Sequence, residues 1–299
     1  MFETENDRKA FLEKYHISDE SFRNSLLSWD ELSRIASDFD SKKDGHECTV
    51  EAIAKEIKQC QHVHSFGYRV KETEHLIEKI IRKNPKCLEK GDMISVSNYE
   101  KHITDLMGLR ILLLFKADWK EVHSYIVDRY GKLFNEEPFV YVRKGDDTSI
   151  YKGLIKIIED PRKSYRSAHY VIRTESGACV EIQVRTLFEE AWSEVDHKIR
   201  YPYHQDNQMM NYYLNILNRL AGISDEMGSF ICSYLKKFED SERVGIATDN
   251  EVYSYILEQI QLCPDEQLKK NIIEKIESAE NFRELKATDE FLSKILREL

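Results

Sequence analysis

The chain has 299 residues, enough for one large domain or two modest ones, and a formal net charge of −10 at pH 7. That charge argues against non-specific duplex binding as a main role, because such binding depends on a basic surface. Six cysteines without a Cys-x-x-Cys pair argue against a zinc ribbon or a disulfide framework and suit a reducing cytoplasm. An acidic N-terminus without an apolar signal segment, and no apolar run long enough to cross a bilayer, predict a soluble cytoplasmic protein without membrane contacts.

Residues 1–60 predict an N-terminal helical segment. Apolar residues at helical spacing run from residue 5 to about residue 40, and the polar stretch 41–45, which ends in Gly45, predicts a break. Thr49 is suited to cap a second helix over residues 50–61.

Residues 61–205 predict a mixed sheet flanked by helices, which is an α+β fold. Strands are expected at 64–71, 104–115 and 139–142, and helices at 73–82 and 119–130. The pair Asn84-Pro85 predicts the end of the first of these helices. A hairpin of strands 168–174 and 178–186 and a helix at 187–200 complete the region.

From residue 206 onward the pattern is helical only. One apolar stripe over residues 209–235 predicts a long helix, and shorter amphipathic helices are expected near 250–262, 265–279 and 281–298. A methionine and aromatic stripe is more typical of packing than of a cofactor site. The region 206–299 is therefore expected to be all-helical, with a homo-oligomer interface and an autoinhibitory element both open as its role.

Two apolar runs contain charged residues. Residues 105–110 read Asp-Leu-Met-Gly-Leu-Arg, and residues 181–185 read Glu-Ile-Gln-Val-Arg. A charge inside an apolar run is costly unless it is paired, hydrogen-bonded or bound to a metal. Because side chains alternate along a strand, the second run predicts one polar face and one packing face.

These residue types suit phosphoryl or pyrophosphoryl transfer. That chemistry needs carboxylates for a divalent metal, cations for the donor phosphates, and a group that activates the acceptor. Asp105 and Glu181 could supply the carboxylates, and Arg69, Lys71 and Lys79 the cations. Any one of them alone is more often a salt bridge; together they indicate a site.

The segment from Tyr141 to Arg173 is basic and rich in tyrosine. It has eight Lys/Arg against four Asp/Glu and includes Tyr165 and His169. A tyrosine in such a segment can stack on a base and a histidine can bind phosphate, whereas an ordinary solvated loop is an equally good interpretation.

Five motifs follow one another in the central region. They are Arg69-Val-Lys71, Asp105-Leu-Met-Gly-Leu-Arg110, Tyr165-x-Ser167-x-His169, Glu181-Ile-Gln-Val-Arg-Thr186 and Trp192-Ser-Glu-Val-Asp-His197-Lys-Ile-Arg-Tyr201. In this order they resemble the synthetase domain of RelA/SpoT-type alarmone synthetases, over roughly residues 60–205.

The resemblance implies transfer of pyrophosphate from ATP to the 3′-hydroxyl of GDP or GTP on a nucleotidyltransferase-like sheet, with Mg²⁺. Asp105 and Glu181 would be catalytic and would bind the metal. The ATP side would comprise Arg69, Lys71, Lys79 and Arg110, and helical spacing places His75 one turn before Lys79, so we expect His75 at the same site. The acceptor side would comprise Tyr165, Ser167, His169, Gln183, Arg185 and His197.

The chain departs from the family pattern at two positions. His75 stands where many members have serine, and Ser164 where many have glycine. No His-Asp dipeptide occurs, and about 60 residues before the synthetase region are too few for the family's hydrolase domain, so we expect synthesis without hydrolysis. Two alternatives are a toxin-type member that modifies the 3′ end of tRNA and a non-catalytic module that senses nucleotides.

The hairpin carries a geometric prediction. His169 and Glu181 face the same side only if paired residue numbers have an even sum, such as 169 with 185 and 173 with 181. A two-residue turn gives an odd sum, so we expect a three-residue loop at residues 176–178 or a bulge.

Overall fold

The computed structural model describes residues 4–159, 165–200, 207–244 and 270. The helices are α1 Glu5–Lys14, α2 Asp19–Asn24, α3 Trp29–Ile57, α4 Thr73–Leu88, α5 Tyr99–His102, α6 Trp119–Tyr130, α7 Leu187–Arg200 and α8 Gln208–Val244. The strands are β1 Ser65–Val70, β2 Met107–Leu113, β3 Phe139–Val142, β4 Lys156–Glu159, β5 Ser167–Arg173 and β6 Cys179–Thr186. Single 3₁₀ turns lie at Lys116–Asp118, Gly131–Leu133 and Ser149–Tyr151.

The strands form one mixed sheet in the order β1-β2-β6-β5-β3-β4. The pairs β2/β6 and β3/β4 are parallel, and the pairs β1/β2, β5/β6 and β3/β5 are antiparallel. The predicted α+β class with a mixed sheet is confirmed. Strand β4 was not predicted, because it lies in the basic segment, where composition obscures a short edge strand.

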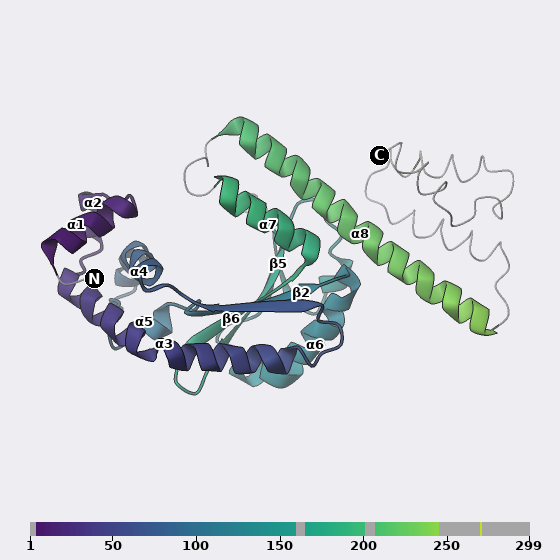
Figure 1. The fold of residues 1–299 in the computed structure, drawn as a ribbon, viewed down its shortest axis with the longest axis horizontal. Helices are drawn as coiled ribbons and strands as arrows, with labels where there is room; N and C mark the ends of the chain where they lie inside the picture. Colours follow the sequence, from purple (N-terminus) through teal and green to yellow (C-terminus); the bar gives the residue numbers. More distant parts are fainter. Residues whose placement is uncertain (1–3, 160–164, 201–206, 245–269, 271–299) are drawn as a thin grey trace.

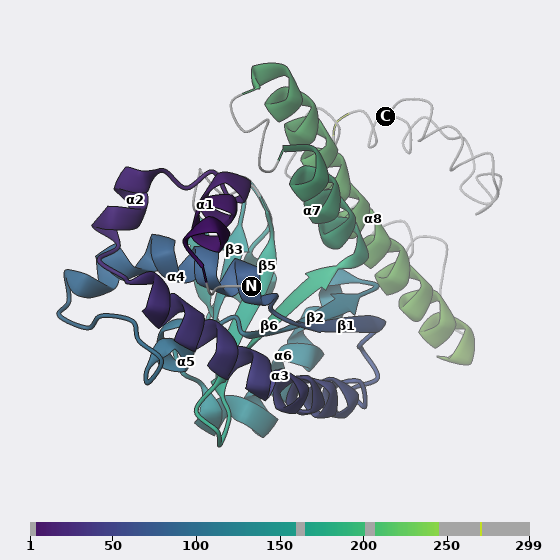
Figure 2. The same cartoon turned by 60° about the vertical axis from the view of Figure 1, so that its left-hand side comes forward.

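The two faces of the sheet are covered differently (Figures 1 and 2). Helices α3, α5 and α6 lie on one side, while α7 and the long α8 lie on the other. Alternate strand residues, including Leu109, Ile111, Ile182 and Val184, are buried on the first side and belong to the apolar core. That core also includes residues of α1 and α2, so the N-terminal helices share it with the sheet.

Helix α3 corrects the predicted break at residues 41–45. It continues through Gly45, which costs only about 1 kcal/mol relative to alanine in a helix interior. Phe39 and Val50, on either side of the expected break, are both fully buried, so packing outweighs the local preference. Thr49 does not cap a second helix; its hydroxyl donates to the Gly45 carbonyl within α3 at 2.8 Å.

Helix α4 likewise passes the predicted stop at Asn84-Pro85 and ends at Leu88. The Asn84 side chain is buried, donates to the Ser25 carbonyl at 2.7 Å and accepts from the Ile94 amide at 2.8 Å. These contacts tie the last turn of α4 to two other segments. They offset the hydrogen bond that proline removes.

The hairpin has the predicted parity but a different loop. His169 pairs with Gln183 and Val171 with Glu181, so the paired numbers have an even sum. The three-residue loop is 175–177, not 176–178: the Thr174 amide donates to the Ala178 carbonyl at 2.9 Å. Gly177 has φ of +91°, the left-handed conformation that ends such a loop, and this places the turn one residue earlier than expected.

Other boundaries agree with the sequence. The predicted helix 119–130 and strand 139–142 match α6 and β3, and α8 confirms the long helix at the start of the C-terminal region. Ser164 and the shorter helices expected beyond residue 244 lie outside the described residues, except for Lys270. Within the described part of the chain, no helix is both long and apolar enough to cross a membrane.

Candidate active site

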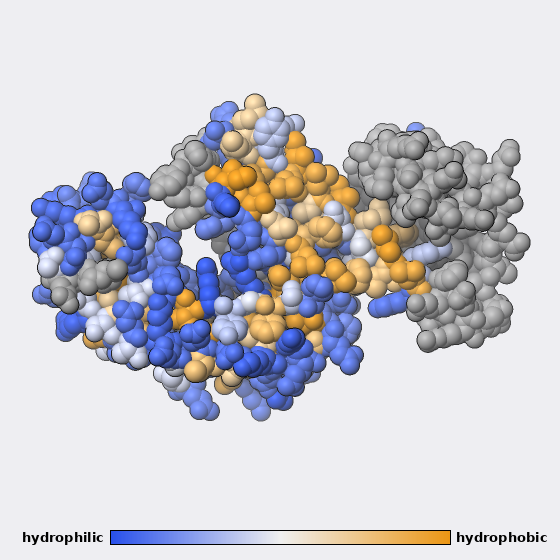
Figure 3. All heavy atoms as spheres, viewed as in Figure 1, coloured by the Kyte–Doolittle hydropathy of each residue, from blue (hydrophilic) through white to orange (hydrophobic). Residues whose placement is uncertain are grey.

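The face of the sheet opposite the apolar core carries the polar residues of the motifs. Across β1, β2 and β6, Arg69 pairs with Gly108 and Gly108 with Glu181, so these positions form one row on this face. In the next row, Arg110 lies between Gly67 and Gln183. Between the N-terminal helices and α7, the molecular surface is hollowed (Figure 3). Strand pairing thus brings residues from distant motifs onto one surface.

Asp105 lies just before β2 between two lysines. Its Oδ2 atom lies 2.9 Å from Lys71 Nζ and 2.6 Å from Lys79 Nζ. Burial alone raises the pKa of Asp105, but the two lysines outweigh burial and lower that pKa below its usual value. The carboxylate is therefore ionised at neutral pH, with two cations beside it.

Glu181 lies on β6 and is held by two neighbours. His169 Nδ1 lies 3.0 Å from Glu181 Oε1, and Gln183 Nε2 donates to Glu181 Oε2 at 3.2 Å. Burial raises the pKa of Glu181, the contacts with His169 lower it by more, and the charge of Asp105 raises it in part. The two carboxylates thus act on each other electrostatically, which joins the Asp105 and Glu181 clusters into one site.

An aromatic group lies beside Glu181 on β3, β5 and the segment before β5. The Phe139 ring stacks on His169 with centroids 5.1 Å apart, and Tyr141 contacts Tyr165 at 5.1 Å. The Arg185 guanidinium lies over the Tyr165 ring, 5.5 Å from its centroid. Burial raises the pKa of Tyr165, so the phenol stays neutral.

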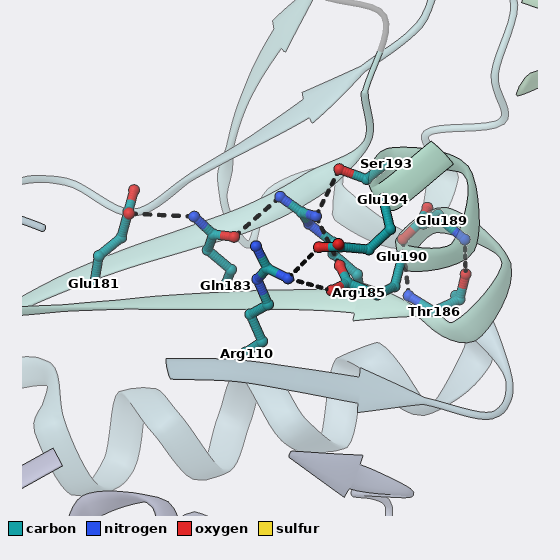
Figure 4. A network of polar contacts seen from close by, with 9 residues as sticks. All are labelled: Arg110, Glu181, Gln183, Arg185, Thr186, Glu189, Glu190, Ser193 and Glu194. Atoms are coloured by element: carbon teal, nitrogen blue, oxygen red, sulfur yellow. Dashed lines mark hydrogen bonds and ion pairs between the residues drawn. The ribbon is translucent and has the colours of Figure 1, made fainter. Parts of the chain in front are cut away.

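Two glutamates of α7 reach down to the arginines of the sheet (Figure 4). Arg110 donates to Glu190 at 2.7 Å and also to Glu194. Arg185 donates to Glu190 at 2.8 Å and to the Ser193 hydroxyl at 2.9 Å, and its other terminal nitrogen donates to Gln183 at 3.0 Å. Helix α7 is thereby bound to both β2 and β6.

Several buried polar atoms of this site have no hydrogen-bond partner among the described residues. They are Asp105 Oδ1, Ser167 Oγ, His169 Nε2 and Arg185 Nε. A buried polar atom without a partner costs free energy, and such atoms are uncommon in native structures. Their concentration on one face indicates that a polar ligand completes the site.

Not every predicted residue joins these clusters. Arg69 lies over Gly108 on the polar face but is exposed. His75 is also exposed and contacts the Tyr15 ring edge-on at 5.8 Å. His197 is exposed on α7.

The basic segment divides between packing and the site. Tyr151 and Tyr170 are buried in the core, and Tyr170 bonds His123 at 2.9 Å. Arg166 pairs with Asp146 and so contributes structure, not a free cation. Among the four tyrosines, Tyr141 and Tyr165 are the ones that lie beside the candidate site.

The residues present suit a magnesium ion. The Oδ1 atom of Asp105 is buried and has no hydrogen-bond partner among the described residues. Glu181 supplies a second carboxylate, close enough for the charge of Asp105 to raise its pKa in part. No group of three or more His, Cys, Asp or Glu that could bind a metal occurs in the described part of the chain. The two carboxylates fit Mg²⁺, which proteins commonly bind through one or two carboxylates together with substrate phosphates.

Sequence reasoning missed the site neighbours Phe139, Tyr141, Glu190 and Glu194. The two glutamates are four residues apart, so they share one face of α7. Their spacing and their position directly after the polar strand were available signals. The sequence does not show which face of α7 meets the sheet.

The central region of the chain matches a known protein family. Residues 68–206 match the sequence profile described as "Region found in RelA / SpoT proteins". These residues belong to the RelA/SpoT family. The match includes all five motifs and so contains both Asp105 and Glu181.

Two named relatives are also similar to this chain. GTP pyrophosphokinase YwaC of Bacillus subtilis (strain 168) is 27% identical over 139 residues, which are 46% of this chain and 58% of YwaC. GTP pyrophosphokinase YjbM of the same strain is 32% identical over 124 residues, which are 39% of this chain and 51% of YjbM. The chain thus spans little more than half the length of these relatives.

Small alarmone synthetase 1 from Bacillus subtilis is similar in structure over 64% of this chain and 94% of that one, with 23% identity and a TM-score of 0.45. This overall similarity is low. The fold therefore rests on the strand order and register described above.

Proposed function

We propose that this RelA/SpoT protein transfers the pyrophosphate group of ATP to the 3′-hydroxyl of GDP or GTP, producing ppGpp or pppGpp and AMP. The observation that carries this proposal is that two part-buried, ionised carboxylates, Asp105 and Glu181, lie close enough on the polar side of the sheet to interact electrostatically. The assignment is supported by relatives named GTP pyrophosphokinase.

In this proposal, Lys71 and Lys79 bind the ATP phosphates, and Arg69 and Arg110 lie on either side of the adenine. Arg69 and Arg110 lie on the neighbouring strands β1 and β2, and each is opposite a glycine in the strand register. The space above Gly67, beside Arg110, is open, and the Arg69 side chain lies over Gly108. Arginine suits this role because its planar group stacks on aromatic faces.

On the acceptor side, Tyr165 stacks on the guanine, while Ser167, His169 and Arg185 bind polar groups of the acceptor. Glu181 accepts the proton of the 3′-hydroxyl while the oxygen of that hydroxyl bonds to the β-phosphorus of ATP. The bond from that phosphorus to the α,β-bridging oxygen breaks, and AMP leaves with the oxygen. Mg²⁺, when bound by Asp105 and Glu181 with the phosphates, would neutralise developing charge.

His75 and His197 are both exposed side chains. His75 lies near the start of α4, and His197 lies on α7. We propose contacts with the ATP phosphates for the first and with the acceptor for the second. Single substitutions that leave both Michaelis constants unchanged would remove them from the site.

The deciding assay incubates the purified protein with labelled ATP and Mg²⁺ and offers GDP, GTP and deacylated tRNA in parallel. We expect label on the guanine nucleotides. Label on tRNA alone would assign the toxin-type reaction, and binding of nucleotides without any transfer would assign a sensor.

We place this reaction in the cytoplasm, in keeping with the free cysteines among the described residues. We also propose that the protein forms a homo-oligomer through its C-terminal helices. Helix α8 exposes several large apolar side chains, among them Met209, Tyr212 and Leu220 (Figure 3). The mass in solution, measured by light scattering, tests it.

A further inference from the structure

Glu190 connects the two sides of the candidate site. Its Oε1 atom accepts from Arg110 of β2 at 2.7 Å, and its Oε2 atom accepts from Arg185 of β6 at 2.8 Å. The side chain of Glu190 is 14% exposed and that of Arg185 is 7% exposed. One carboxylate in the first turn of α7 is therefore shared between an arginine proposed for ATP and an arginine proposed for the acceptor.

The sharing orients both arginines. Glu190 and Glu194 accept from the same terminal nitrogen of Arg110, so carboxylates occupy that edge of its guanidinium. The flat face is then the part available to a ligand. A Cβ built on Gly67, which pairs with Arg110, would meet no atom within 4 Å, so the space beside this arginine is open.

Arg185 is fixed from several directions. Besides Glu190, it donates to Ser193 and Gln183, and its guanidinium lies over Tyr165. Its Nε atom is buried and has no partner among the described residues. The Nε–H group is therefore left for a ligand, while three N–H groups of the two terminal nitrogens hold the side chain in place.

We propose that Glu190 is a positioning residue that holds Arg110 and Arg185 in a single arrangement, so that one carboxylate sets the affinity for both nucleotides. The proposal rests on the proposed function, which assigns the two arginines to different nucleotides. Breaking a buried ion pair leaves an uncompensated charge and frees side chains that the pair had oriented. Loss of Glu190 therefore affects both sides at once.

Glu194 provides a matched control, because its exposed carboxylate contacts Arg110 and not Arg185. The experiment measures dissociation constants by calorimetry for a non-hydrolysable ATP analogue and, separately, for GDP. For Glu190→Gln we expect both to weaken by about 10-fold, the scale of a charged hydrogen bond. For Glu194→Gln we expect a loss of roughly 3-fold for the ATP analogue and none for GDP.

A kinetic measurement separates positioning from a general loss of structure. Glu190→Gln should raise both Michaelis constants by more than it lowers kcat, a split that a loss of folded protein alone would not produce, even though the uncompensated charge on Arg185 also lowers the thermal unfolding midpoint. Weakening of only one ligand, or equal effects in the two glutamate variants, would overturn the inference.

A second variant keeps the test decisive if Glu190→Gln does not fold. In the variant Arg110→Gln, Arg185 becomes the one arginine that pairs with Glu190. We expect this to draw Arg185 toward α7 and to weaken GDP binding at least about 3-fold. Unchanged GDP binding would contradict coupling through Glu190. If the unmodified protein binds neither nucleotide, the proposed function fails; if it binds both and transfers pyrophosphate while the variants bind normally, only this inference fails.

Discussion

The two faces of the central sheet are made from the same strands and have opposite properties. On one face, Leu109, Ile111 and Ile182 are fully buried against helices. On the other face, Arg110 and Glu181 take part in ion pairs and hydrogen bonds, and several buried polar atoms have no hydrogen-bond partner within the part of the chain that the structure describes. The apolar face is complete by itself, whereas the polar face is arranged for a ligand.

This difference separates stability from chemistry at the level of neighbouring residues. Glu181 and Ile182 are adjacent in sequence but point to opposite faces, because side chains alternate along a strand. Burial of apolar area stabilises the fold, and charges on the other face cost stability unless they are paired. Substitutions on the two faces should therefore change different measurements.

The largest effect is expected at the two carboxylates. Asp105→Asn and Glu181→Gln should each lower the rate of pyrophosphate transfer by on the order of 10²–10³, because the metal and base roles need ionised oxygens. Both variants should still fold, with a lower unfolding midpoint, because the lowered pKa of each carboxylate means that its neighbours favour the ionised form in the folded protein. Retention of more than about a tenth of the activity in either variant would exclude the assigned roles.

The neighbouring core position should show the reverse pattern. Ile182 is fully buried on the apolar face, and Ile182→Ala should lower the free energy of unfolding by about 2–5 kcal/mol through lost burial and a cavity. Denaturant titration measures this loss. The Michaelis constants of the folded fraction should change little; a selective loss of substrate binding would show that the two faces are not separable.

Tyr165 tests the aromatic part of the polar face. Tyr165→Ala should raise the Michaelis constant for GDP or GTP about 10-fold, the scale of one lost base–aromatic contact, with a smaller change for ATP. Steady-state kinetics with each substrate varied in turn measures the ratio. Tyr165→Phe is the control, because it keeps the ring and removes the hydroxyl.

Asp225 tests a carboxyl on the polar side of the sheet but outside the site. It lies on α8, is 3% exposed, and accepts from the Thr186 hydroxyl at 2.7 Å. Burial and then the charge of Glu189 raise its pKa from 3.8 to about 7, with Lys116 and Arg166 opposing the shift.

Because the folded pKa of Asp225 lies above the unfolded value, the folded state retains a proton as the pH rises from about 4 to about 7, and stability falls across that window. Asp225→Asn keeps the acceptor oxygen and removes the titration. Its advantage over the unmodified protein should grow by on the order of 4 kcal/mol between pH 4 and pH 8. Urea unfolding at the two pH values measures this, and a constant difference would contradict it.

The smallest effect is expected at Gly45, on a helix that covers the apolar face. A Cβ at this position would meet no atom within 4 Å, so Gly45→Ala should fit without strain. We expect a gain of about 0.5–1 kcal/mol in the free energy of unfolding and unchanged transfer activity. A loss of stability would show that α3 needs the glycine.

The sequence by itself determined which residues alternate between the two faces and which motifs come together. The pattern of residues 181–185 predicted the polar and apolar sides of β6, and the even register of the hairpin followed from placing His169 and Glu181 together. Helix α6 and strand β3 were also predicted at their observed bounds. These properties depend on periodicity, which is local to the chain.

Only the tertiary structure decided how far elements extend and which partners their charges have. Burial of Phe39 and Val50 carries α3 through Gly45, and the contacts of Asn84 carry α4 past Pro85. The sharing of Glu190 between Arg110 and Arg185 requires α7 to lie across two strands. Such contacts join residues distant in sequence, and local preferences of about 1 kcal/mol yield to the larger free energy of burial and ion pairing between elements.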